Sequence, residues 1–338
     1  MNLSNSPENE TFSATLSSEP VRWPGAIMII YSLTCICTYV PCLMTIMSNK
    51  ETARSPSYQI ILHIAYTDLA QLSLNGIIGG IFSLFQTDFN FYLNKVIGGT
   101  MNSIWIVCGT LADVLAWNRL CHTFSPTMAK RIFTLKNTRI ILALCWLSGL
   151  PWTVAYMLPN LDLIYDPTEH NWNYGPNPES QNFAIGELVH DVFHCASMIV
   201  CYTAIISKLV VQAKRITNSQ LNVDKKERLV LLQSMWLCIT FVLGILLFFY
   251  STAIIPNHWA LFFTTLVWLT MAGSNPFIYL IFNKSIRRQV LHNLLSCTRK
   301  AIAQSAPAQS RNTINVASVG DKTNGASRSP KIMFASPS

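Results

Sequence analysis

The chain has 338 residues, of which 51% are hydrophobic and only 12% are charged, whereas a soluble domain carries about a quarter charged residues. Too few polar side chains remain to cover a water-soluble core, and the unbroken apolar blocks exclude a disordered or fibrous chain. The composition therefore predicts an all-α integral membrane protein, and the formal net charge of +8 must be interpreted from the location of the basic residues.

Seven apolar stretches are long enough to cross a bilayer, which takes about 20 helical residues. A helix is required because it satisfies its own backbone hydrogen bonds in lipid. The predicted spans are Pro24–Met47, Tyr58–Phe85, Val96–Cys121, Thr138–Leu158, Phe183–Val211, Leu229–Ile255 and Trp259–Phe282. We expect an N-terminal tail (1–22), a seven-transmembrane helix domain (23–283), an amphipathic interfacial helix (284–297) and a disordered cytoplasmic tail (298–338).

The basic residues predict the orientation in the membrane. All except Arg22 and Lys95 lie in or beside the loops after the first, third and fifth spans, or after the seventh. Such loops stay in the cytoplasm, so we expect a multi-pass plasma-membrane protein with its N-terminus outside. The charge then favours contact with membrane lipid, not nucleic acid. Asn2 and Asn9 are candidate glycosylation sites on the outer side, and Cys297 is a candidate palmitoylation site. Four tryptophans are expected at the outer interface: Trp23, Trp152, Trp172 and Trp259.

Polar side chains inside the spans are costly in lipid and are therefore functional candidates. The ionisable ones are Asp68, Asp113, Arg119, Glu187, His190, Asp191 and His194. Asp113 lies six residues before Arg119 and points about 240° away from it on a helix. The two side chains therefore cannot pair, and the sequence assigns no role to Asp113.

Several of these residues lie in motifs that resemble those of rhodopsin-like G-protein-coupled receptors. Asp68 lies in the second span, Arg119 ends the third, and Asn275-Pro276-Phe277-Ile278-Tyr279 ends the seventh. Leu115-Ala116-Trp117-Asn118-Arg119 further resembles the Leu-Ala-x-Asn-Arg signature of nematode serpentine chemoreceptors of classes Srx and Srt. The resemblance implies a seven-transmembrane receptor that binds an extracellular ligand and activates a heterotrimeric G protein, in sensory cells and their cilia. It assigns coupling and activation to Asp68, Asn118, Arg119, Asn275, Pro276 and Tyr279. Asp68 is alternatively a structural acid that is hydrogen-bonded to Asn275.

The chain departs from the usual rhodopsin-like pattern in three places. Asn118 stands where most such receptors have an acid, so it cannot form the ion pair that restrains their inactive state. The third span lacks the usual outer Cys, and Leu161–Asn182 contains none, so we expect no extracellular disulfide. The sixth span has no Pro, which argues against the common kinked-tryptophan switch.

The ligand site is expected in the outer half of the bundle. The resemblance places the amine-binding position of related receptors at Met101, near Asn102 and Trp105. No carboxylate lies there, so an amine held by the third span is disfavoured. Residues Glu187, His190, Asp191 and His194 form a stripe within about 100° of one helix face. We expect it to bind a polar or cationic ligand through its two acids, and its histidines to make the response depend on pH.

Other interpretations of the stripe and of the whole chain stay open. The stripe alternatively forms a hydrogen-bonded seam to the fourth or sixth span, or an incomplete metal site. The receptor alternatively takes a neuropeptide in place of a small molecule. More remote alternatives are a transporter, which would normally show inverted repeats, and an intramembrane metallohydrolase, which needs more ligands than are found here. We expect no enzyme activity, no cofactor and no bound metal.

Overall fold

The computed structural model describes residues 21–49, 53–213, 224–254, 259–282, 286–293 and 295–296. The chain divides into two units, residues 1–287 and 288–338, and the helix bundle belongs to the first. Residues 286–293, within the predicted amphipathic segment, are helical. The candidate modification sites Asn2, Asn9 and Cys297, and the predicted tail over 298–338, lie outside the described residues.

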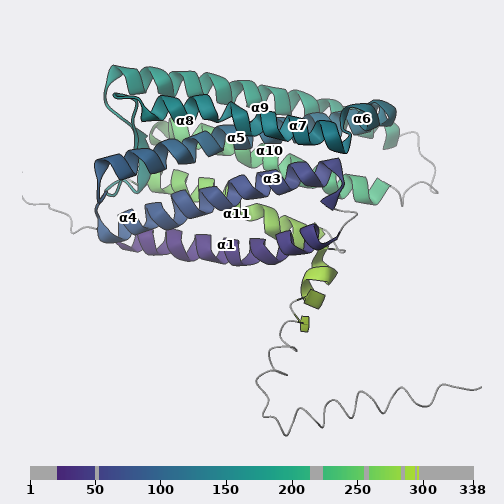
Figure 1. Cartoon of the computed structure of the whole chain (residues 1–338), viewed down its shortest axis with the longest axis horizontal. Helices are drawn as coiled ribbons and strands as arrows, with labels where there is room; N and C mark the ends of the chain where they lie inside the picture. The colour runs from purple at the N-terminus through teal and green to yellow at the C-terminus, as the bar shows by residue number, and fades with distance from the viewer. Residues whose placement is uncertain are drawn as a thin grey trace, which may run out of the picture. The chain divides into compact units, whose positions relative to one another are not determined.

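The first unit is a bundle of seven membrane-spanning helices, two of which are made of consecutive segments (Figure 1). The second span comprises α3, the π-helix η1 and α4, and the fourth comprises α7 and α8. The elements are α1 (Trp23–Ser48), α3 (Pro56–Gln71), η1 (Leu72–Ile78), α4 (Gly79–Phe85), α5 (Phe91–Phe124), α6 (Pro126–Ile132), α7 (Leu135–Ser148), α8 (Leu150–Met157), α9 (Pro178–Ala213), α10 (Asp224–Ile254) and α11 (Ala260–Phe282).

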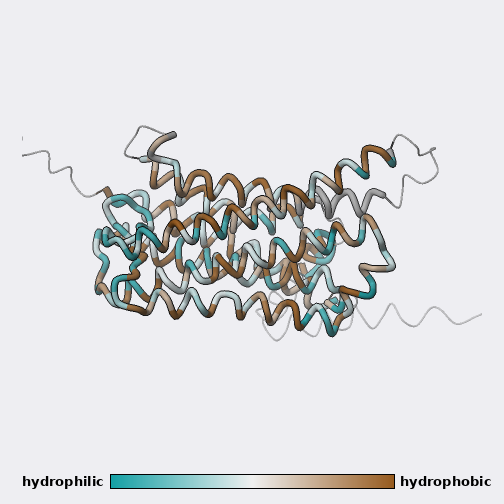
Figure 2. The backbone as a smooth tube through the Cα atoms, turned by 90° about the horizontal axis from the view of Figure 1, so that it is seen from above, coloured by the Kyte–Doolittle hydropathy of each residue, from teal (hydrophilic) through white to brown (hydrophobic). Residues whose placement is uncertain are grey.

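Each predicted span overlaps the corresponding helical span, and the largest difference is five residues, at the starts of α5, α9 and α10. Among the described residues, six helices are long and apolar enough to cross a bilayer, and α10 contributes a shorter apolar run, Cys238–Ser251. Hydrophobic residues follow the middle of the bundle and hydrophilic residues gather at its ends (Figure 2). The helices continue beyond their apolar cores because the backbone hydrogen bonds of a helix extend into polar flanking residues.

The fourth span is interrupted near Pro151. α7 ends at Ser148 and α8 begins at Leu150, with Pro151 in the first turn of α8. A proline is tolerated there because the first amides of a helix have no intrahelical partner. The π-helix η1 in the second span was not predicted, since its residues Leu72–Ile78 continue an ordinary apolar run.

An all-α fold was predicted, and the structure adds a short hairpin between α8 and α9. Strands β1 (Leu163–Asp166) and β2 (Asn171–Tyr174) pair antiparallel, with Leu163 opposite Tyr174. The prediction that Trp172 anchors at the membrane interface is wrong. Its side chain is 1% exposed, and its Nε1 donates a hydrogen bond of 3.0 Å to Oδ1 of Asn75 in η1. The hairpin thus folds inward over one end of the bundle, which we call the hairpin end.

Non-covalent contacts attach the hairpin to α5. The side chain of Asn94 donates to the Tyr165 carbonyl at 3.1 Å and accepts from the Tyr165 amide at 2.8 Å. Lys95 forms a 2.7 Å ion pair with Asp162. At Gly98, an added Cβ would lie 2.0 Å from the Leu163 carbonyl oxygen, so only glycine permits this approach. The nine cysteines in the described part of the chain are free, as expected from the missing extracellular pair.

The turn of the hairpin carries a buried histidine. His170 adopts a left-handed backbone conformation with φ of 56°. Its Nδ1 lies 2.9 Å from the hydroxyl of Ser83 in α4. Burial lowers the pKa of His170, and this effect exceeds the opposing charge of Asp166. Burial therefore favours the neutral imidazole at this position.

Candidate polar seam and cavity between α5 and α9

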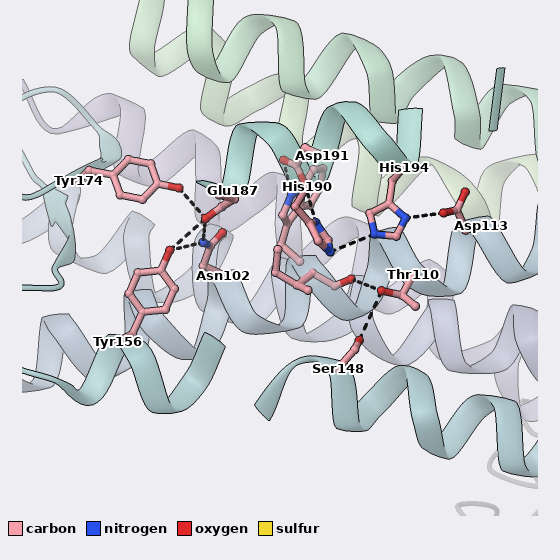
Figure 3. A network of polar contacts seen from close by, with 12 residues as sticks. Asn102, Thr110, Asp113, Ser148, Tyr156, Tyr174, Glu187, His190, Asp191 and His194 are labelled. Carbon is pink, nitrogen blue, oxygen red and sulfur yellow. Dashed lines mark hydrogen bonds and ion pairs between the residues drawn. The ribbon is translucent and has the colours of Figure 1, made fainter. Parts of the chain in front are cut away.

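The stripe predicted on α9 is directed into the bundle and contacts α5 (Figure 3). Nearest the hairpin end, one carboxylate oxygen of Glu187, Oε2, accepts three hydrogen bonds. They come from the amide of Asn102 in α5, the hydroxyl of Tyr156 in α8 at 3.0 Å, and the hydroxyl of Tyr174 in β2 at 2.6 Å. Four separate elements therefore converge on this buried carboxylate.

One turn further along α9, Asp191 binds a tryptophan of α5. Its Oδ2 accepts a 3.1 Å hydrogen bond from Nε1 of Trp105. Its other oxygen, Oδ1, lies 3.6 Å from Nδ1 of His190. Asp191 is buried and His190 is half-buried, so the carboxylate is largely removed from solvent.

The third set of contacts includes Asp113, to which the sequence assigned no role. Nδ1 of His194 is hydrogen-bonded to Oδ2 of Asp113, and Nε2 of His194 lies 3.0 Å from Nε2 of His190. Asp113 thus belongs to the seam between α5 and α9, where it supplies the carboxylate opposite His194.

A sequence signal for this pairing exists on α5. At 100° per residue, Asn102, Trp105 and Asp113 fall within an arc of about 80°, similar to the arc of the α9 stripe. Two polar stripes of matching width on apolar helices satisfy one another most readily face to face. The expected seam partner was the fourth or sixth span, whereas the structure places the third span opposite. The fourth span adds the hydroxyl of Tyr156 beside Glu187 and the ring of Trp152 beside His190.

An aromatic cavity adjoins the two acids of α9. Trp105 stacks on Phe241 of α10 with centroids 4.6 Å apart and planes at 5°, and it contacts Trp268 of α11 at 5.0 Å. The cavity has an empty volume of about 260 Å³, but in this conformation it admits roughly one water molecule. It is lined by Trp105, Glu187, Asp191, Gly244, Ile245, Phe248, Phe249 and Trp268.

Among the residues described, one polar atom at the cavity has no hydrogen-bond partner, and two carboxylates there have no Lys or Arg partner. Nε1 of Trp268, a buried donor, has no partner within the described chain. In the same residues, no Lys or Arg forms an ion pair with Glu187 or Asp191. A buried carboxylate without a cationic partner is unfavourable, so the cavity is electrostatically suited to a cation.

Two expectations about the site need qualification. Met101 was placed with the ligand-binding residues, but it does not line the cavity. Its carbonyl accepts a 2.9 Å hydrogen bond from Gln71 of α3.

No group of three or more His, Cys, Asp or Glu side chains in the described residues is arranged to hold a metal ion. The α9 stripe therefore gives no geometric support to a metal site.

The residues expected to take part in activation form a second buried cluster. Asp68 accepts hydrogen bonds from the hydroxyl of Tyr39 in α1 and from the amide of Asn275 in α11 at 2.8 Å. The contact between Asp68 and Asn275 is the one expected from the sequence. Pro276 lies within α11, and Tyr279 is buried one turn away from Asn275.

The Asn118–Arg119 pair lies near the end of α5 that is distant from the hairpin. Asn118 is fully buried, and its Oδ1 accepts a 2.8 Å hydrogen bond from the hydroxyl of Ser57 in α3. Arg119 is half-buried. Close to them, the ammonium of Lys208 in α9 donates to the carbonyl of Thr123. A neutral amide-to-hydroxyl contact thus occupies the position where an acid is usual.

Comparisons with known proteins agree with this architecture. The model of the family described as serpentine type 7TM GPCR chemoreceptor Srt matches residues 5–303. The serpentine receptor class T-55 of Caenorhabditis elegans is 22% identical over 260 residues, which cover 74% of this chain and 68% of that protein. Squid rhodopsin superposes with a TM-score of 0.60 at 15% identity, over 82% of this chain and 86% of that chain. At that identity the likeness shows the fold alone.

Of the two chemoreceptor classes that the sequence resembles, Srt is thus the one matched, and the match extends over nearly all of the bundle. The family consists of receptors and not enzymes, which confirms the expectation of no enzymatic activity. The chain belongs to the Srt family of serpentine seven-transmembrane G-protein-coupled chemoreceptors.

Proposed function

We propose that this chemoreceptor binds a small cationic ligand in the aromatic cavity and, when occupied, activates a heterotrimeric G protein at the opposite end of the bundle. It acts in the plasma membrane of sensory cells, including their cilia, with its N-terminus and hairpin outside. The observation that carries the proposal is the pair of buried acids, Glu187 and Asp191, beside Trp105 and Trp268. Within the described residues, no Lys or Arg is paired to either acid.

The physical case for a cation rests on charge and on aromatic faces. At an effective dielectric constant of about 20, a carboxylate and an ammonium about 4 Å apart attract by roughly 4 kcal/mol. A cation over the face of a tryptophan gains a further ~0.5–2 kcal/mol. Glu187 and Trp268 line the same cavity, so one ligand can receive both contributions.

The cavity size favours a small molecule over a peptide. Pockets for drug-sized ligands have volumes of roughly 300–1,000 Å³, whereas this cavity is narrow and admits only about one water molecule in this conformation. The hairpin also packs on α5 at that end of the bundle. Entry of even a small amine therefore requires Phe248 or Phe249 of α10 to move outward, and such a movement of α10 is the conformational change we link to activation.

The coupling surface is proposed around Arg119. Asn118 and Ser57 hold α5 against α3, and Asp68 and Asn275 join the second and seventh spans. These contacts connect the helices whose repacking would expose a G-protein site. Their role is to restrain the resting arrangement, and that of Arg119 is to contact the G protein.

Signalling in cells tests the proposal directly. The full-length receptor is expressed with several Gα subunits and treated with a panel of primary amines, including propylammonium, and with the alcohol of the same size as a neutral control. We expect responses to amines only, and Asp191→Asn should raise the half-maximal amine concentration at least tenfold. The exposed Asp88→Asn is the matched control. Equal responses to the alcohols, or to peptides alone, would contradict the proposed ligand class.

A further inference from the structure

The chain of contacts Asp113–His194–His190–Asp191, which we call the imidazole chain, has one hydrogen too few when both histidines are neutral. The Asp113 carboxylate accepts, so Nδ1 of His194 carries a hydrogen. Nε2 of a neutral His194 then accepts from Nε2 of His190 across 3.0 Å. Nδ1 of His190 is left with a lone pair that faces the Asp191 oxygen 3.6 Å away.

Two acceptor atoms facing each other repel, and this nitrogen is buried without a hydrogen-bond partner in the described residues. One added proton resolves the mismatch in either of two ways. His190 becomes the imidazolium and donates to Asp191, or His194 does so and His190 reverses its tautomer, again donating to Asp191. Both arrangements contain one proton more than the neutral chain, so the stoichiometry does not depend on the tautomer.

The charges around His190 favour that proton. Its own helix contributes Glu187, Asp191, His194 and Cys195, α5 contributes Asp113, and α10 contributes Cys238. The neighbouring α8 presents the ring of Trp152 at 5.5 Å and, beside Glu187, the hydroxyl of Tyr156, while β2 presents that of Tyr174. Three carboxylates thus face two imidazoles, with no Lys or Arg bonded to them in the described chain.

We propose that the imidazole chain binds one proton that ties His190 to Asp191, and that this proton competes with the cationic ligand for the Asp191 carboxylate. The second half of the inference rests on the proposed function; the first does not. Asp191 is the shared group because it lines the cavity and also faces His190. Acid should therefore lower the sensitivity of the receptor to amines.

The proton site is tested without any ligand. Full-length receptor carrying ring-¹⁵N histidine is placed in phosphatidylcholine nanodiscs, and its imidazole signals are followed between about pH 8 and pH 5.5, where imidazoles in general titrate. We expect one imidazole signal to become doubly protonated on acidification, and His190→Gln and His194→Gln assign it to one of these two residues. In Asp191→Asn that conversion should require a lower pH, because the imidazolium loses its carboxylate partner. His170→Asn, a change outside the seam, should leave it unaltered.

The two halves of the inference fail separately. If neither His190 nor His194 becomes doubly protonated over this range, or if Asp191→Asn leaves the titration of the chain unchanged, the proton site is refuted. Competition is measured with propylammonium, which stays charged over this range because primary alkylamines have a pKa of about 10.4. Its half-maximal concentration should rise on acidification by up to about tenfold per pH unit, the limit for one competing proton. The rise should be less steep in His190→Gln, where only the carboxylates at the cavity can take up a proton.

Equal pH dependence in the wild type and in His190→Gln would refute competition even when the proton site is found. Absence of any propylammonium response, with the proton titration intact, would overturn the proposed ligand class and the competition together, but not the proton site.

Discussion

The triple hydrogen bond at Glu187 allows its charge and its hydrogen-bonding capacity to be separated experimentally. Oε2 accepts from Asn102, Tyr156 and Tyr174. Glu187→Gln keeps an oxygen for these donors and removes the charge. Glu187→Leu removes both, in a side chain of similar size. The two variants should therefore differ in stability but not in their loss of ligand affinity.

The magnitudes follow from the donors that lose their acceptor. Asn102 also donates to the Tyr156 hydroxyl, so in Glu187→Leu two buried donors, the hydroxyls of Tyr156 and Tyr174, lose the acceptor. Each costs about 1–3 kcal/mol, so the free energy of unfolding should fall by roughly 2 kcal/mol or more. In Glu187→Gln the hydrogen bonds weaken, but the cost of burying a charge disappears, and these effects oppose each other. Its unfolding free energy should stay within about 1 kcal/mol of the wild type. Both variants should need at least tenfold more propylammonium, about 1.4 kcal/mol.

Two measurements separate the structural role of Glu187 from its role in ligand binding. Thermal unfolding of nanodisc-reconstituted receptor reports the stability, and the half-maximal propylammonium concentration in cells, normalised to surface expression, reports the affinity. Asp88→Asn serves as the control for both. A Glu187→Leu variant that melts with the wild type would refute the structural role of the three hydrogen bonds. Unchanged amine potency in Glu187→Gln would exclude Glu187 as a ligand contact.

Three further outcomes are expected. Arg119→Ala should abolish G-protein activation while surface expression persists, because the residue is half-buried; full signalling would contradict its coupling role. Truncation at Arg299, outside the described residues, should leave the initial response intact and slow its decay, because phosphorylation sites for desensitisation are lost; a lost initial response would contradict this. Burial lowers the pKa of His170, so its contribution to stability is present above the unfolded value of about 6.5 and declines as pH falls. The melting temperature should therefore fall less on acidification in His170→Asn than in the wild type, and an equal fall would refute this.

The helical spans and one buried pair could be predicted from the sequence, because lipid imposes a length and a hydropathy on each span. Asp68 and Asn275 are both polar residues inside apolar helices, so a contact between them was expected. That the Glu187 stripe faces the bundle was also predictable, because polar side chains that face lipid are energetically unfavourable. Its partner helix was not predicted, because a periodic pattern gives the face of one helix and not its rotation relative to the others.

The hairpin was missed for a different reason. Its strands have four residues each, and no isolated two-stranded hairpin of that length is stable in water. It exists because Trp172 reaches Asn75, and Asn94 binds the Tyr165 backbone. Contacts between residues more than 70 positions apart leave no local signal. Met101 illustrates the same limit, since its place in a motif does not determine which way its side chain points.

The attachment of the hairpin without a disulfide bears on how the receptor matures. Receptors that close this loop with a cystine depend on an oxidising compartment to complete their folding. Here the loop is fixed by the Lys95–Asp162 ion pair and by amide contacts, none of which needs an oxidant to form. Reductants should leave the hairpin in place, and synthesis in a cell-free system without an oxidant should yield the same fold. The stability of this attachment should instead depend on ionic strength, because salt screens a partly exposed ion pair.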